Sequence, residues 1–128
     1  MIKLTPLLFC FFLIYGANGQ DKILEDIGTS LKNGSARELI KFCANPLTIK
    51  LNNNSDSYSR EQAEATLRKF FLDNPPSNFS YIHQGSSDES LRYCIGKYTM
   101  KQGSYRVVLL LKQQSSDFLV DTITLTRE

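Results

Sequence analysis

His83 is the single histidine of this 128-residue chain, and it stands just before the run Gly85-Ser86-Ser87. A histidine can act as a general base if a nucleophile and an orienting acid lie within hydrogen-bond reach. The two serines follow too closely along one strand to face the imidazole, and no nucleophile-elbow pattern surrounds them. The run is therefore typical of a strand end and a turn in which Gly85 permits unusual backbone angles. We keep His83 as a candidate ligand contact and not as a catalytic base.

Two charged side chains interrupt apolar strand patterns nearer the C-terminus. Asp121 shares one strand face with Leu119 and Ile123, and Arg106 stands inside an apolar run. If that face of the strand lines a pocket, Asp121 could accept a proton in an enzyme. If the face meets solvent, the carboxylate is hydrated or ion-paired, which is the commoner case. Opposite charges on neighbouring strands stabilise a sheet, so we expect an Arg106–Asp121 pair that makes both residues structural.

Several tyrosines also lie in strand patterns. Two of them, Tyr81 and Tyr93, join His83, Arg106 and Asp121 as candidate ligand-binding residues. Tyrosine in a sheet usually packs its ring against neighbours and leaves its hydroxyl at water. The set contains no convergent nucleophile, acid and base, so we assign no catalytic residue and expect no cofactor.

The first 19 residues have the pattern of a signal peptide. Lys3 precedes an apolar run over residues 4–15, and the small residues Ala17 and Gly19 follow where a signal peptidase would read them. The run is too short to span a bilayer well. We expect cleavage after Gly19, export to the periplasm or the medium, and one domain over residues 20–128 without a membrane anchor.

Cys43 and Cys94 would remain after that cleavage. In an oxidising compartment they could form a disulfide that closes a long loop and stabilises the fold by about 4 kcal/mol. The alternative, which we favour, is two buried thiols that pack as small apolar side chains. Neither cysteine has metal-ligand spacing, so the sequence predicts no metal site.

Helical periodicity comes before strand alternation along the chain. Ser35 with Glu38 and Ser59 with Gln62 form capping-box patterns, each in front of a helix. Helices are predicted over 21–34, 36–44 and 60–74, a turn over 52–57, and strands over 47–51, 78–84, 90–100, 104–113 and 117–126. This order predicts an α+β domain whose helices cover one face of a bent, mostly antiparallel sheet.

Charge and hydropathy indicate which partners to expect. The formal net charge is only +2 and the basic residues are scattered, which argues against nucleic acid as a partner. The segment 104–113 is nearly continuously apolar, as expected for a strand covered on both faces. A large apolar sheet face marks an interface, so we expect a homodimer formed through the sheet.

Two longer segments carry a family resemblance. FFLDNPPSNFSYIHQGSS and YCIGKYTMKQGSYRVVLLLK resemble a family of small exported bacterial proteins of unknown function with a nuclear transport factor 2-like (cystatin-like) fold. The resemblance extends from about Asp21 to Leu125. It implies a cone in which three N-terminal helices cover the concave side of the sheet, often with a pocket between the two layers.

The fold alone does not decide the function, because cones of this kind serve both enzymes and binding proteins. We expect an exported, non-catalytic binding or assembly module that holds a small ligand or a protein partner in the cone or on the sheet. The alternative is an enzyme of isomerase or dehydratase type that uses Asp121 or His83 with a tyrosine. The enzyme hypothesis requires Asp121 and His83 to point into one enclosed cavity.

Overall fold

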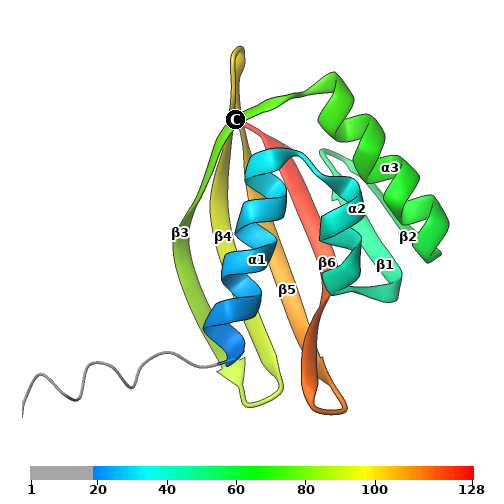
Figure 1. The fold of residues 1–128 in the computed structure, drawn as a ribbon, viewed down its shortest axis with the longest axis vertical. Helices are drawn as coiled ribbons and strands as arrows, with labels where there is room; N and C mark the ends of the chain where they lie inside the picture. The colour runs from blue at the N-terminus through cyan, green and yellow to red at the C-terminus, as the bar shows by residue number, and fades with distance from the viewer. Residues whose placement is uncertain (1–18) are drawn as a thin grey trace, which may run out of the picture.

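The computed structural model describes residues 19–128 (Figure 1). The helices are α1 (Gly19–Asn33), α2 (Ala36–Leu39), the short 3-10 helix η2 (Ile40–Phe42) and α3 (Arg60–Asp73). The strands are β1 (Cys43–Leu51), β2 (Asn54–Tyr58), β3 (Pro76–Asp88), β4 (Leu91–Met100), β5 (Gly103–Gln114) and β6 (Asp117–Arg127). The six strands form one sheet in the order β2-β1-β6-β5-β4-β3. Only the β1–β6 pair is parallel.

Helix ends follow from local chemistry that the sequence already displayed. The hydroxyls of Ser35 and Ser59 accept hydrogen bonds from the backbone N–H three residues ahead, at the starts of α2 and α3. Gly34, with φ of 66°, follows α1 and supplies the left-handed conformation that favours glycine. The predicted capping residues are therefore confirmed, although α2 is much shorter than the helix expected there.

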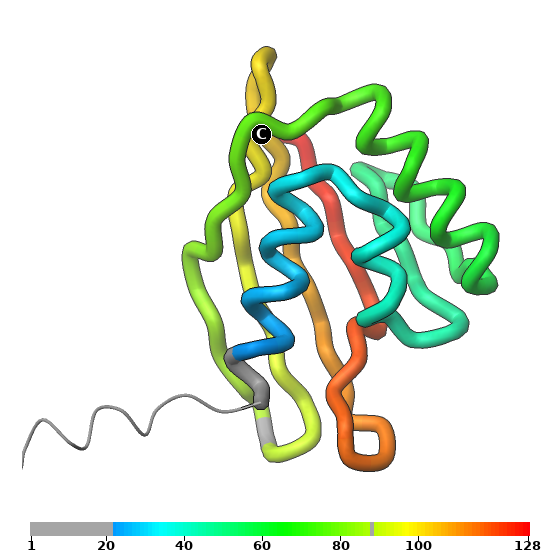
Figure 2. Tube along the Cα trace, viewed as in Figure 1, coloured from blue at the N-terminus to red at the C-terminus, as the bar shows by residue number. Residues whose placement is uncertain are grey.

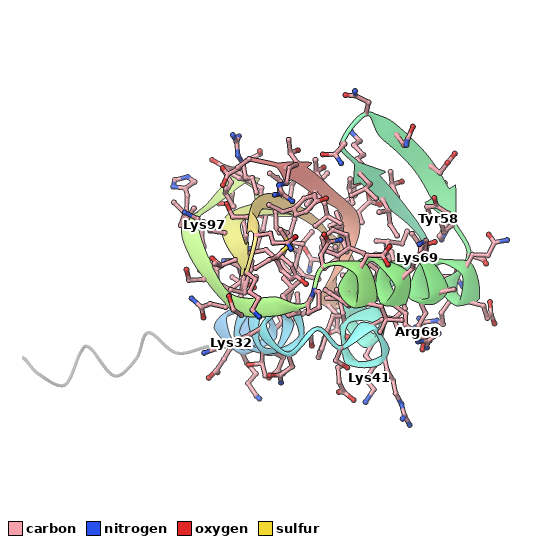
Figure 3. All side chains as sticks on the ribbon, turned by 90° about the horizontal axis from the view of Figure 1, so that it is seen from above. Lys32, Lys41, Tyr58, Arg68, Lys69 and Lys97 are labelled. Carbon is pink, nitrogen blue, oxygen red and sulfur yellow. The ribbon has the colours of Figure 1, made fainter. Side chains whose placement is uncertain are left out.

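The helices pack on one face of a curved sheet (Figures 1 and 3). α1 buries Leu24, Ile27 and Leu31, which recur at helical spacing on its inner side. The sheet meets them with alternate residues of its strands, including the fully buried Tyr98 and Leu109. An aromatic cluster fills one end of this core, formed by Phe70, Phe71, Tyr98 and Tyr105.

Two expectations about the elements were wrong. Residues 54–58, within and beyond the predicted turn, form β2, an edge strand made of polar residues that pairs with β1. α3 follows both β1 and β2 in the chain, so the three helices are not all N-terminal to the sheet as the family resemblance implied. The polar side chains of β2 gave no alternating apolar signal, because this strand is exposed along most of its length.

The C-terminus lies at the end of the sheet where α3 connects to β3 and β4 turns into β5 (Figure 2). The backbone N–H of Glu128 donates to the carbonyl of Ser104 at 3.0 Å, and the Arg127 guanidinium donates to the carbonyl of Gln102 at 2.7 Å. These contacts hold the end of β6 against β5 and against the β4–β5 turn.

Candidate functional site

His83 lies on the face of the sheet that turns away from the helices. The β3–β4 register shifts between Tyr81 and His83, so His83 pairs with Ile95, whereas Phe79 pairs with the buried Tyr98. Simple alternation along the predicted strand 78–84 would put His83 on the face of Phe79 and Tyr81, but a bulge inserts one extra residue between Tyr81 and His83 and turns His83 to the opposite face. His83 is exposed and its ring lies 5.7 Å from that of Tyr93. It does not line the interior of the domain.

The run after His83 continues the strand and does not form the predicted turn. β3 extends to Asp88, and Gly85 pairs with Tyr93 inside the ladder. A Cβ atom on Gly85 would lie 2.6 Å from the Tyr93 hydroxyl oxygen. Glycine is needed here because the tyrosine ring lies over the backbone, and not because of an unusual backbone angle.

Asp121 and Arg106 lie apart, so the predicted Arg106–Asp121 pair was wrong. Arg106 pairs in register with Thr126, and its Nε lies 3.6 Å from a carboxylate oxygen of Glu128. Asp121 falls where the β5–β6 register shifts, and its carboxylate lies 3.7 Å from Nζ of Lys112. Both ion pairs are partly exposed and lie at opposite ends of the outward face of β5.

Tyr81 is the one candidate that points toward the helices. Its hydroxyl donates a 2.7 Å hydrogen bond to the carbonyl of Leu24 in α1. Burial raises the pKa of Tyr81 above its ordinary range, and the nearby Cys94 adds to this shift. A hydroxyl with a raised pKa that is bound to a helix carbonyl ties α1 to β3 and is poorly suited to donate its proton in a reaction.

Cys43 and Cys94, the two cysteines within residues 19–128, are free and buried. Cys43 begins β1 and Cys94 lies in β4, with β6 and β5 between these strands. Burial raises the pKa of Cys43 to about 12 and also raises that of Cys94. A thiol with such a raised pKa carries almost no thiolate near neutral pH, so neither cysteine is equipped as a nucleophile.

An apolar patch lies on the convex face of the sheet, and the sequence indicated it only indirectly. Tyr93 pairs with Leu110 and Ile95 pairs with Val108, and all four side chains turn away from the helical layer. We call these four residues the convex patch. They are half-buried, and none of the helices in residues 19–128 packs over them (Figure 3). The apolar run over 104–113 predicted a strand covered on both faces. In the described chain, however, no helix covers the outer face of β5.

The opposite surface of the molecule has a different chemistry. The outer sides of the helices carry charged residues that pair within each helix, such as Arg68 with Glu64 at 2.6 Å and Lys69 with Asp73 at 2.9 Å. Lys32, Lys41 and Arg68 mark this side in Figure 3. A face of self-paired charges is suited to water, whereas the convex patch is not.

The hollows on the surface of the described residues include two of moderate size. One, of about 450 Å³, lies between the α3–β3 connection and the β4–β5 turn, and Asn74, Pro76, Met100 and Gln102 are among its lining residues. The other, of about 260 Å³, lies between α1 and β3 beside Tyr81. Neither of these two hollows is lined by His83 or Asp121, and the strands that carry these residues, β3 and β6, are separated by β4 and β5.

In the part of the chain that the structure describes, His, Cys, Asp and Glu side chains nowhere gather in a group of three that could hold a metal ion. Its helices are too short or too polar to cross a bilayer. The predicted signal peptide, apart from Gly19, lies outside the described residues.

A family profile for a domain of unknown function, DUF4783, matches residues 24–126, which is most of the chain. The chain belongs to the DUF4783 family. The resemblance inferred from the two long segments is thereby confirmed. A DUF4783 protein from Bacteroides ovatus has 26% identity and a TM-score of 0.77, over 80% of this chain and 93% of that one. The search among curated proteins found no match.

More distant solved structures show the wider fold. An NTF-2 like protein of unknown function from Shewanella oneidensis has 9% identity and a TM-score of 0.61, over 84% of this chain and 95% of that one. A protein from Xanthomonas campestris, described as a candidate calcium/calmodulin dependent protein kinase II association domain, has 14% identity and a TM-score of 0.64 over 85% of both chains. DUF4783 therefore shares the nuclear transport factor 2-like fold, an α+β domain with a curved sheet.

Proposed function

We propose that this DUF4783 protein is an exported, non-catalytic assembly module that pairs with a second copy of itself through the convex patch. The observation that carries the proposal is the position of Ile95, Val108 and Leu110. These apolar side chains turn outward from the central strands on a face without a covering helix in the described chain. Apolar surface of this kind on a folded domain is typical of an interaction site.

A second copy is the occupant that best matches this face. In a two-fold dimer the same patch serves both partners, so an apolar face on one chain finds an equally apolar face on the other. Sheets pack face to face through such side chains. The Xanthomonas campestris relative in fold is described as an association domain, which supports assembly as one use of this architecture.

The enzyme alternative receives no support from the geometry. His83 on β3 and Asp121 on β6 are separated by β4 and β5. His83 is exposed and Asp121 is already ion-paired with Lys112. Tyr81 and both cysteines are held in their protonated forms by burial. An acid–base mechanism would need these groups near one reacting atom.

Light scattering on the protein purified from its natural host tests the proposal. We expect a dimer that dissociates on dilution, and we expect Leu110→Asp to remain folded but monomeric at every concentration. Leu72→Asp is the matched control, because Leu72 lies on α3 and is 73% exposed. Equal masses for the unmodified protein and Leu110→Asp would contradict the proposal. Mass spectrometry of the same sample tests export, since cleavage after Gly19 leaves Gln20 as the first residue.

A further inference from the structure

We infer that Tyr93 is the anchor of the convex patch, the residue of each copy that contributes most to the affinity of the dimer, and that Gly85 positions it. This inference rests on the proposed function, because it names the residues on which assembly through that face depends. Ile95, Val108 and Leu110 supply the remaining apolar surface of the patch.

Gly85 determines where the ring of Tyr93 lies. The two residues are register partners on β3 and β4. A Cβ atom on Gly85 would lie 2.6 Å from the Tyr93 hydroxyl oxygen and 2.9 Å from Cε1 of the ring. The outer half of the ring therefore occupies the space that a side chain at position 85 would fill, and the ring extends the apolar surface of the patch over β3.

Neighbouring side chains confine this ring on two further sides. Leu110 is the register partner of Tyr93 on β5, on the side away from Gly85. The ring of His83 lies 5.7 Å from that of Tyr93, measured between the ring centroids. Tyr93 is nonetheless only half-buried. The ring is thus held in place within the single chain and still presents surface to a partner.

A ring that is held in this way can be buried by a partner at a low entropic cost. Association normally loses free energy by ordering mobile side chains at the interface. Tyrosine has only two rotatable side-chain bonds, and the neighbours of Tyr93 already confine its ring, so little further ordering is needed. Its large apolar ring and its polar hydroxyl together make tyrosine one of the residues that most often dominate interfaces.

The aliphatic members of the convex patch are less suited to act as the anchor. Leucine and valine are under-represented among the residues that dominate binding energy, and their usual part is to exclude water around an anchor. In a two-fold dimer the same patch serves both partners. One substitution at Tyr93 consequently removes two rings from the interface, so its effect on the affinity should be large.

Substitution of Tyr93 tests the anchor, with the dimer dissociation constant measured by sedimentation equilibrium. Tyr93→Ala should raise this constant at least about a hundredfold, whereas Ile95→Ala, the matched control on the same strand and face, should raise it about tenfold or less. Tyr93→Phe keeps the ring and should stay within about threefold of the unmodified protein. Tyr93→Leu keeps an apolar side chain but no ring, and should raise the constant about tenfold.

Gly85→Ala tests the positioning of the ring. The added methyl group takes the place of the Tyr93 hydroxyl, and a half-buried ring can swing aside, so the chain should fold with its anchor displaced. We expect the dissociation constant to rise about tenfold in the unmodified chain. In the Tyr93→Leu background it should change by less than about twofold, because leucine is too short to reach over position 85.

Gly28→Ala is the matched control for the added methyl group. A Cβ atom on Gly28 would lie 3.1 Å from the ring of Tyr81, which is also a tyrosine of the sheet but points toward the helices. This substitution places a methyl group beside a tyrosine ring on the opposite face, so it should leave the dissociation constant unchanged.

A tyrosine over a glycine can also serve the strand alone, because an aromatic ring can compensate for a glycine in an edge strand. If Tyr93 had only that role, Tyr93→Ala and Gly85→Ala would lower the urea midpoint and leave the dissociation constant of the folded chain unchanged. Urea unfolding of each variant, followed by circular dichroism, separates this loss of stability from a loss of affinity.

The outcomes distinguish this inference from the proposed function. If Leu110→Asp is monomeric but Tyr93→Ala and Ile95→Ala weaken the dimer equally, Tyr93 is not the anchor and assembly through the convex patch stands. If Gly85→Ala weakens the dimer as much in the Tyr93→Leu background as in the unmodified chain, Gly85 does not act through the ring. A protein that is monomeric before any substitution would refute the proposed function and this inference together.

Discussion

At the scale of single residues, close packing on the inner face of the sheet depends on a glycine, which leaves room for a neighbouring ring. Gly96 lies on the inner face of β4, and a Cβ atom there would lie against the Phe79 ring and 3.0 Å from the carbonyl oxygen of Ser80. Phe79 is itself buried. Because cores are close-packed, the ring has little room to move aside.

We therefore predict that Gly96→Ala destabilises the fold by about 1–3 kcal/mol, the usual penalty for an overpacked core. Urea unfolding followed by circular dichroism would measure the change. The double variant Gly96→Ala with Phe79→Leu should be less destabilised than the sum of its single variants, because the shorter side chain makes room for the methyl group. Strict additivity of the two changes would show that the steric explanation is wrong.

The buried titrating groups give a second prediction at this scale. The pKa of the Cys43 thiol is raised from 9.0 to about 12 by burial. Between these values the folded chain holds a proton that the unfolded chain has released. The free energy of unfolding should therefore be unaffected by this group below pH 9 and should fall as the pH rises toward 12, by up to about 1.4 kcal/mol per pH unit.

Urea midpoints at pH 8 and pH 10 would check this dependence. Burial also raises the pKa values of Tyr81, Tyr98 and Cys94, so these groups act in the same direction. Cys43→Ala should consequently show a shallower loss of stability with pH, not a flat profile. An unmodified protein whose stability is the same at both pH values would contradict the assignment.

At the scale of elements, the tether between α1 and β3 is the contact that most clearly joins the two layers. The Tyr81 hydroxyl donates to the carbonyl of Leu24, and a Cβ on Gly28 would lie only 3.1 Å from the Tyr81 ring. The tyrosine thus packs in a space that a glycine of α1 leaves open.

Tyr81→Phe should keep the ring packing and lose the hydrogen bond, at a cost of about 1 kcal/mol in unfolding free energy. Tyr58→Phe is the matched control, since the Tyr58 hydroxyl makes no hydrogen bond within the described residues and Tyr58 is only partly buried. Chemical denaturation of the unmodified protein, Tyr81→Phe and Tyr58→Phe would measure these differences in unfolding free energy. Equal losses of unfolding free energy in Tyr81→Phe and Tyr58→Phe would show that the hydrogen bond from Tyr81 to Leu24 does not stabilise the fold.

The elements also show why sequence reasoning succeeded in part. The helix starts at Ser35 and Ser59 were predictable, because capping depends on residues only three positions apart. The face of His83 was not predictable, because the bulge beside Ile82 reverses the alternation and depends on the register with β4. The strand face of Asp121 was predicted wrongly for the same reason, since Asp121 falls at the register shift between β5 and β6.

At the scale of the whole molecule, the order of elements was sufficient for the fold class, because helices followed by antiparallel strands have few compact solutions. The candidate site was harder to find. The sequence showed that residues 104–113 carry more apolar side chains than one covered face needs, but not which of them turn outward. The ladder assigns Val108 and Leu110 to the convex side and Val107 and Leu109 to the core.

In the proposed assembly, the convex patch is buried by a second copy of the chain. Sedimentation equilibrium of the unmodified protein, over a hundredfold range of concentration, tests it most directly, because buoyant mass reports the number of chains without regard to shape. Burial of the convex patch by a second copy should give a reversible equilibrium between one-chain and two-chain species, with the two-chain mass reached at the highest concentration. A one-chain mass throughout the range would contradict it.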